Sequence, residues 1–113
     1  MMKRIDAVIR PERLEQVKAR LSSLDIQGAT AAEVRGFGRQ RGHAEMYRGT
    51  EYSVDFLPKI LLTIIAADER VPQIVDAIIH GGRTGKMGDG KIFVTPVDEV
   101  IRIRTGERGP AAL

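Results

Sequence analysis

The order of two helical patterns and of the β-branched runs around them constrains the fold of this chain most. Apolar residues recur at helical spacing twice, first at Leu14, Val17, Leu21 and Leu24, and again at Val71, Ile74, Val75, Ile78 and Ile79. Runs that predict strands cover residues 4–10, 30–37, 59–66 and 91–95, with a short fifth run at about 99–104. This β-α-β-β-α-β order predicts an α+β, ferredoxin-like fold with an antiparallel sheet and a short extra C-terminal strand.

Proline, glycine and aspartate residues mark the expected ends of the two helices. Pro11 suits the first turn of the first helix, and Gly28 can stop it. Asp68 can cap the second helix, and Gly81 and Gly82 mark its end. Two helices cover one face of a four-stranded sheet, so an aliphatic opposite face would have to be buried in an oligomer.

Length and composition indicate a single domain over residues 1–113 with an aliphatic core, since 42% of the residues are hydrophobic and only 4% are aromatic. Lysine and arginine number 18 against 15 aspartates and glutamates, which leaves a net charge of +3. The basic residues are dispersed along the chain, which argues against nucleic acid as the main partner.

The residues that are rare or absent exclude several classes of chemistry. The chain has no cysteine, which excludes disulfides and thiolate nucleophiles and fits a reducing compartment. His43 and His80 are too far apart in the sequence to suggest a metal cluster. There is no apolar signal stretch, and no apolar run approaches the ~20 residues of a membrane span. We therefore expect a soluble, cytoplasmic protein.

A glycine-rich turn with two lysines lies between the second helical pattern and the next strand. From Gly85 to Lys91 it matches the phosphate-binding pattern G-x-x-x-x-G-K, but Ile92 stands where Mg²⁺ binding requires Ser or Thr. The order of elements is also reversed, because a P-loop follows a strand and precedes a helix. The turn therefore predicts a site that holds phosphates without cleaving them; the alternative is a flexible connector.

Two further features of the C-terminal half fit an anion site. In the run from Ile101 to Arg104, the alternation of a strand would put Arg102 and Arg104 on one face, roughly 7 Å apart. Guanidinium groups at that spacing can bind neighbouring phosphates, although a charged edge strand explains them equally well. Asp89 is expected to order the turn through contacts with its backbone.

The polar segment from Gly38 to Pro58 is longer than most loops in compact domains. Tyr47 and Tyr52 lie in it among charges and glycines, which favours a partner-docking or modifiable loop over a disordered insertion. No grouping of nucleophile, base and acid with a recognisable motif occurs in the chain. His80 fits a helix C-terminal cap better than a catalyst.

Four separated stretches together resemble the PII signal-transduction proteins of nitrogen control, over essentially the whole chain. They are Gly36-Phe-Gly-Arg-Gln-Arg-Gly-His43, Tyr47-Arg-Gly-Thr-Glu-Tyr52, Thr84-Gly-Lys-Met-Gly-Asp-Gly-Lys-Ile-Phe-Val94 and Val100-Ile-Arg-Ile-Arg-Thr-Gly-Glu107. The resemblance implies a homotrimer with inward-facing sheets and ATP or ADP in the clefts between subunits. It also implies three functional loops: a T-loop at about 38–57, a B-loop at about 83–91 and a C-terminal loop at about 102–113.

The resemblance also assigns ligand roles to individual residues. The nucleotide site would comprise Thr30, Gly38, Arg39, Ile65, Gly88, Asp89, Gly90, Lys91, Arg102 and Arg104, with the two arginines supplied by the neighbouring subunit. The 2-oxoglutarate site would comprise Gly38, Arg39, Gln40, Arg41, Gly42 and Lys59, with Gln40 also binding Mg²⁺ together with ATP phosphates and the metabolite. Lys59 would pair with the distal carboxylate.

Two residues of the segment match positions that are modified in relatives. Tyr52 matches a tyrosine that is uridylylated or adenylylated in many members, and Thr50 stands where some cyanobacterial members carry a phosphorylated serine. Arg41, Met87 and Pro11-Glu-Arg13 depart from the common family residues without removing a proposed ligand.

These expectations together describe a regulatory sensor that is not an enzyme. They do not exclude slow hydrolysis of ATP. Partners in the family include an ammonium channel, a nucleotidylyltransferase, a sensor kinase and N-acetylglutamate kinase, so a membrane would be met only through the channel. The alternatives are a small ferredoxin-like phosphohydrolase and a nucleic-acid-binding module. Dispersed charge and scarce aromatic residues argue against the second.

Overall fold

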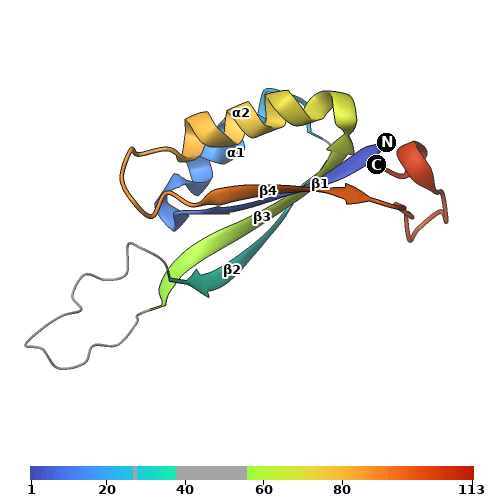
Figure 1. The fold of residues 1–113 in the computed structure, drawn as a ribbon. Helices are drawn as coiled ribbons and strands as arrows, with labels where there is room; N and C mark the ends of the chain where they lie inside the picture. The colour runs from blue at the N-terminus through green and yellow to red at the C-terminus, as the bar shows by residue number, and fades with distance from the viewer. Residues whose placement is uncertain (27, 38–55) are drawn as a thin grey trace, which may run out of the picture.

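A computed structural model describes residues 1–26, 28–37 and 56–113 of the chain. In these residues, four strands and two helices follow one another in the order β1 (Met2–Ile9), α1 (Leu14–Ser22), β2 (Thr30–Gly36), β3 (Leu57–Ala67), α2 (Val71–Gly82) and β4 (Lys91–Val97). All pairings are antiparallel, and the strand order is β2-β3-β1-β4. Both helices lie on the same side of the sheet (Figure 1). The predicted α+β fold with an antiparallel sheet is confirmed.

The core between the helices and the sheet is aliphatic, as the composition predicts. Its largest fully buried side chains come from both layers and are Ile5, Ile64, Ile74, Ile78 and Val17. The register puts Ile5 of β1 opposite Ile64 of β3, so both point toward the helices. Gly81 lets the helices approach closely, because an added Cβ there would lie 2.8 Å from the Cα of Val17.

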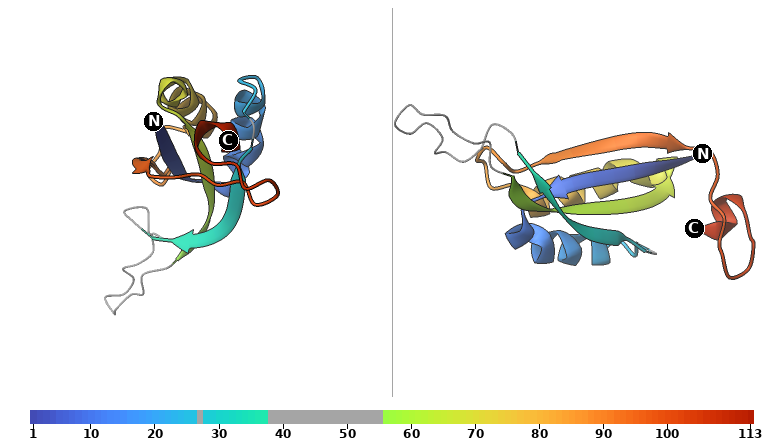
Figure 2. Two further views of the ribbon diagram at one scale, coloured as in Figure 1. Left: turned by 90° about the vertical axis from the view of Figure 1, so that its right-hand side faces the viewer. Right: turned by 90° about the horizontal axis from the view of Figure 1, so that it is seen from below.

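The opposite face of the sheet, which we call the open face, is not covered by either helix. Seen from below, the four strands lie in front and the helices behind them (Figure 2). Alternation and register give the open face both apolar and polar side chains, among them Arg4, Asp6, Val8, Leu61, Thr63, Ile65, Phe93 and Val97. Phe93 is 51% exposed. The burial of this face in an oligomer stays a prediction.

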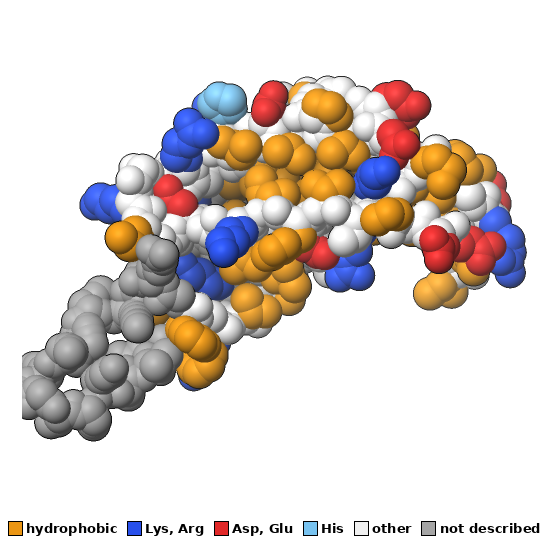
Figure 3. Space-filling view, viewed as in Figure 1, with side chains coloured by type: hydrophobic (Ala, Val, Ile, Leu, Met, Phe, Trp, Pro, Cys, Tyr) orange, Lys and Arg blue, Asp and Glu red, His pale blue; other side chains and the backbone are white. Residues whose placement is uncertain are grey.

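Hydrophobic side chains also gather between α2 and β4, where Figure 3 shows them as a continuous patch. A pocket of about 340 Å³ lies there, and Val75, Ile79 and Ile92 are among the residues that line it. The described part of the chain contains no helix that is long and apolar enough to cross a membrane.

The prediction of an extra strand at about 99–104 is wrong, because only Ile101 of that range takes part in a β-bridge. Ile101 forms a single antiparallel bridge with Arg108, and a turn covers residues 103–105. The chain reverses because Gly106 adopts a φ of 75°, which favours glycine, and its N–H donates to the carbonyl of Arg102 at 2.7 Å. A short 3-10 helix, η4 (Gly109–Ala112), follows. This segment therefore forms a small hairpin beyond the end of the sheet.

The helix ends also differ in part from the expectations. Pro11 begins a 3-10 turn, η1 (Pro11–Arg13), directly before α1, but α1 ends at Ser22, well before Gly28. Asp68 does not cap α2: it begins another 3-10 turn, η3 (Asp68–Arg70), and its carboxylate lies 3.3 Å from the Nζ of Lys3. An ion pair with the neighbouring strand thus replaces the expected cap, whereas the second helix ends at Gly82 as predicted.

Candidate functional site

The glycine-rich turn joins the end of α2 to the start of β4, and three of its glycines adopt conformations that other residues rarely reach. Gly85, Gly88 and Gly90 have φ angles of 91°, 98° and 105°. At Gly90 the approach to β1 is also close, since an added Cβ would lie 1.7 Å from the carbonyl oxygen of Val8. The glycines are therefore required by the shape of the turn.

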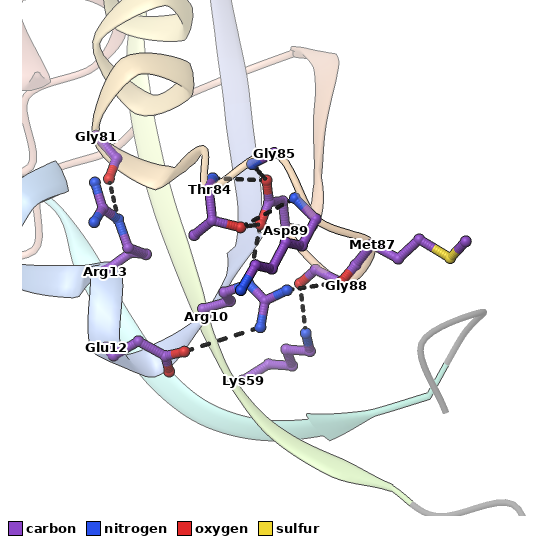
Figure 4. Close-up of polar contacts among 11 residues, drawn as sticks. Arg10, Glu12, Arg13, Lys59, Gly81, Thr84, Gly85, Met87, Gly88 and Asp89 are labelled. Atoms are coloured by element: carbon purple, nitrogen blue, oxygen red, sulfur yellow. Dashed lines mark hydrogen bonds and ion pairs between the residues drawn. The ribbon is translucent and has the colours of Figure 1, made fainter. Parts of the chain in front are cut away.

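The carboxylate of Asp89 holds this turn together from within. Its Oδ2 accepts hydrogen bonds from the backbone N–H groups of Thr84 and Gly85, each at 2.8 Å, and its Oδ1 accepts one from the Thr84 hydroxyl. These contacts converge on one side chain (Figure 4). The expectation that Asp89 orders the turn is confirmed.

Arg10, which sequence reasoning missed, braces the turn from the end of β1. Its Nε donates to Asp89 Oδ1 at 3.0 Å, and its Nη2 donates to the carbonyl oxygen of Met87 at 2.7 Å (Figure 4). Arg10 and Asp89 are 16% and 23% exposed, so the pair is partly shielded from water. Only the pairing of β1 with β4, which brings the end of one strand beside the start of the other, reveals this role.

Hydrogen bonding keeps the Asp89 carboxylate ionised. Burial raises the pKa of Asp89, but the hydrogen bonds from Thr84, Arg10 and Gly85 together hold that pKa well below its usual range. An ionised carboxylate with this many donors is a structural anchor and a poor general base.

Lys59, near the start of β3, brings a second cation to the turn. Its Nζ donates to the carbonyl oxygen of Gly88 at 2.7 Å, and the residue is only 9% exposed (Figure 4). Burial lowers the pKa of Lys59, and the nearby charge of Arg10 lowers it further. The charges of Glu12 and Asp89 act in the opposite direction, so Lys59 lies in a cluster that contains both cations and carboxylates.

Lys59 and the part of the turn from Lys86 to Lys91 line a common pocket of about 550 Å³. Its walls include five of the predicted site residues: Lys59, Gly88, Asp89, Gly90 and Lys91. Gly36 and Phe37, which directly precede the polar segment, also line it. We call this pocket the turn half-site.

Three other predicted site residues lie together elsewhere. Thr30, Ile65 and Arg102 line a separate pocket of about 660 Å³, which we call the hairpin half-site. Arg102 donates there to Glu107 Oε1 at 2.7 Å and to the Leu113 carbonyl at 3.0 Å. The two pockets share no lining residue. Lys59 and Ile65 are six residues apart along β3, a span of about 20 Å.

The predicted alternation of Arg102 and Arg104 on one strand face is wrong. The turn at 103–105 places Arg104 in an exposed position at the tip of the hairpin, whereas Arg102 is half-buried against its own chain. The remaining predicted residues, Gly38, Arg39, Gln40, Arg41, Gly42, Thr50 and Tyr52, lie outside the described residues.

The sequence of this chain is similar to a known family over nearly its whole length. The family model "Nitrogen regulatory protein P-II" matches residues 2–107. The chain is 55% identical to the nitrogen regulatory protein P-II of Pasteurella multocida and 54% identical to the nitrogen regulatory protein GlnK of Escherichia coli, in each case over 99% of this chain and 100% of the relative.

A solved structure agrees with the family model. The crystal structure of Arabidopsis thaliana PII bound to citrate superposes with a TM-score of 0.82 at 39% sequence identity, covering 99% of this chain and 92% of that one. The family match over nearly the whole length, the close relatives and the shared fold lead to one conclusion. The chain belongs to the nitrogen regulatory protein P-II family.

Proposed function

We propose that this protein is a trimeric cytoplasmic sensor that binds ATP or ADP in clefts between subunits and controls partner proteins through its T-loop, residues 38–57. In the presence of MgATP it would also bind 2-oxoglutarate. The observation that carries the proposal is the division of the predicted nucleotide residues between two pockets of one chain. Neither half-site is complete, and two copies of the chain would supply both halves of one cleft.

The turn half-site is suited to phosphates. Successive glycines leave backbone N–H groups free of side-chain crowding, and Lys91 adds a positive charge at the start of β4. The carboxylate of Asp89 is already used within the turn. Its role at the nucleotide would therefore be to fix the backbone of Gly88 and Gly90, and not to contact phosphate through its oxygens.

The hairpin half-site of the next subunit would close the cleft. Thr30 and Ile65 offer a hydroxyl and an apolar surface, which suit the sugar and base of a nucleotide. Arg102 and the exposed Arg104 would add guanidinium groups for the phosphates. The uncovered open face would supply the contact that brings three copies together.

A dicarboxylate fits the buried cation of the turn half-site. Lys59 points at the turn, where its Nζ donates to the carbonyl oxygen of Gly88. The Nζ of Lys59 would donate to one carboxylate of 2-oxoglutarate, either instead of the Gly88 carbonyl oxygen or in addition to it. When bound, Mg²⁺ would link the other end to ATP, with Gln40 as a further ligand. Citrate in the Arabidopsis structure supports a carboxylate ligand in this family.

A regulatory role is favoured over a phosphohydrolase. The relatives are named as regulatory proteins, and the acid of the turn, Asp89, is committed to four donors. Control would pass through residues 38–57, because Gly36 and Phe37 join the pocket to that segment. Partners would be proteins of nitrogen metabolism such as a channel, kinase or nucleotidylyltransferase, with Tyr52 as a modification site.

Calorimetry tests the ligand part of this proposal. The protein is titrated with 2-oxoglutarate in the presence of ATP and Mg²⁺, of ATP and EDTA, and of ADP and Mg²⁺. Heat is expected only with MgATP. Gln40→Ala should weaken 2-oxoglutarate binding and leave ADP affinity nearly unchanged. No heat for the metabolite with MgATP, or equal losses of both ligands in the variant, would contradict the proposal.

A further inference from the structure

The guanidinium group of Arg102 is held from two sides by the C-terminal part of its own chain. Its Nη1 donates to Glu107 Oε1 at 2.7 Å, and its Nη2 donates to the carbonyl oxygen of Leu113 at 3.0 Å. Both terminal nitrogens of the group therefore already have an acceptor. Phosphate oxygens bind guanidinium N–H groups in the same way as carboxylate oxygens do.

A single backbone hairpin brings the two charged side chains together. The N–H of Arg102 donates to the carbonyl oxygen of Glu107 at 2.9 Å, beside the β-bridge of Ile101 with Arg108. The Thr105 hydroxyl donates to Glu107 Oε1 at 3.1 Å and helps to orient the carboxylate. The ion pair is thus a product of the local turn and forms within one copy of the chain.

The residues that follow the hairpin line the hairpin half-site. Ala112, in η4, is 9% exposed, and both Ala112 and Leu113 line the same pocket as Thr30 and Ile65. The hairpin and η4 lie at the opposite end of the sheet from the glycine turn (Figure 1). The C-terminal segment, residues 107–113, is therefore part of the wall of this pocket and at the same time the partner of its arginine.

The ion pair is open to water on one side. The side chains of Arg102 and Glu107 are 35% and 45% exposed. An ion pair with this exposure separates readily, because water screens the two charges and solvates both groups when they part. The phosphates of a nucleotide carry more negative charge than one carboxylate and can take the place of Glu107 beside the guanidinium group.

We propose that Glu107 competes with nucleotide phosphate for Arg102, so that the C-terminal segment sets the nucleotide affinity of the hairpin half-site. The inference rests on the proposed function, which takes phosphate as the ligand of Arg102, and adds a regulatory residue that has no role assigned in either half-site. Without nucleotide, Glu107 balances the charge of Arg102. When nucleotide binds, the ion pair opens, and the free energy of opening is subtracted from that of binding.

Calorimetric titration of the full chain with ATP tests the inference. Glu107→Gln keeps the size of the side chain and an acceptor for Thr105 but removes the charge. It should bind ATP about two- to fivefold more tightly than the wild type, which corresponds to the strength of a partly exposed ion pair. Glu99→Gln is the matched control, because Glu99 lies in the same C-terminal region but pairs with Arg108. Its ATP affinity should equal that of the wild type.

A double-mutant cycle shows whether Glu107 acts through Arg102. In the Arg102→Ala background, Glu107→Gln should no longer change ATP affinity, because the group for which Glu107 competes is absent. Circular dichroism verifies that each variant folds.

Three results would overturn the inference while the wild type binds ATP. They are unchanged or weaker ATP binding by Glu107→Gln, an equal gain in Glu99→Gln, and an equal gain from Glu107→Gln in the Arg102→Ala background. Weaker binding would mean that Glu107 orients Arg102 for the phosphates and does not compete with them. A wild type that binds no ATP would contradict the proposed function and this inference together.

Discussion

Arg10 and Asp89 are separated by 79 residues in the sequence, and their side chains form an ion pair with 3.0 Å between Nε and Oδ1. The pair joins the end of β1 to the glycine turn, and the second bond of Arg10, to the Met87 carbonyl, extends the brace across the turn. The backbone that we propose to bind phosphate is therefore held in place before any ligand arrives, which reduces the conformational entropy lost on binding.

Removing this brace should weaken nucleotide binding. Arg10→Met keeps the aliphatic stem but loses both hydrogen bonds, so we expect ATP affinity to fall about tenfold and stability to fall by about 1–2 kcal/mol. Calorimetry and urea unfolding measure the two effects. Arg20→Met, at an exposed position of α1, is the matched control. Unchanged ATP affinity in Arg10→Met would show that the contacts of Arg10 do not prepare the turn for ATP binding.

The pKa of Asp89 predicts how stability depends on pH. Because the folded-state pKa lies below the unfolded value of about 3.9, the ionised group stabilises the fold above that pH. This contribution is lost as pH falls through the folded-state pKa. Asp89→Asn should therefore be less stable than the wild type at pH 7, and the difference should shrink in strong acid. Urea unfolding of both proteins from pH 7 to pH 2 measures the difference in unfolding free energy. A difference that stays constant with pH would contradict the lowered pKa of Asp89.

Gly90 should tolerate no side chain. A Cβ would lie 1.7 Å from the Val8 carbonyl, and the φ of 105° adds backbone strain. Gly90→Ala should cost about 3 kcal/mol or more and disturb the pairing of β1 with β4. Gly28→Ala has no atom within 4 Å of its added Cβ and serves as the control. Equal thermal unfolding midpoints for the two variants would show that the turn can rearrange.

Lys59 should matter for the metabolite more than for the fold. Lys59→Met loses the bond to the Gly88 carbonyl but also removes the cost of burying a charge, so stability should change by less than about 1 kcal/mol. Binding of 2-oxoglutarate with MgATP should fall at least about tenfold, since a carboxylate loses its cation. Calorimetry that finds full 2-oxoglutarate affinity in Lys59→Met would place the distal carboxylate elsewhere.

The sequence predicts those parts of the structure that depend on local periodicity. The stripe of Ile74 and Ile78 and the glycines that end α2 identify the helix correctly, because burial on one face and loss of helical propensity are local properties. The residues of the glycine turn are likewise evident from their composition. These local signals are sufficient for the element order and for half of the candidate site.

The other contacts depend on pairing between strands that are far apart in the sequence. Arg10 reaches the glycine turn because β1 lies beside β4, and Asp68 pairs with Lys3 because β3 ends beside the start of β1. Ile101 and Ile103 have the composition of a strand, so the sequence predicts one after β4, whereas in the structure Gly106 reverses the chain and a hairpin forms. No local pattern reports such tertiary effects.

The central claim is that one ligand site is built from the turn of one chain and the hairpin half-site of another. Two variants test it, one with Lys91→Glu and one with Arg102→Ala and Arg104→Ala together. Each alone should bind ATP weakly. When the two variants are co-expressed with different affinity tags and purified as mixed trimers, random mixing restores about a quarter of the sites to wild-type composition. ATP titration of the mixed trimers should then recover wild-type affinity at that fraction of sites; mixed trimers that bind no better than either parent would contradict the shared site.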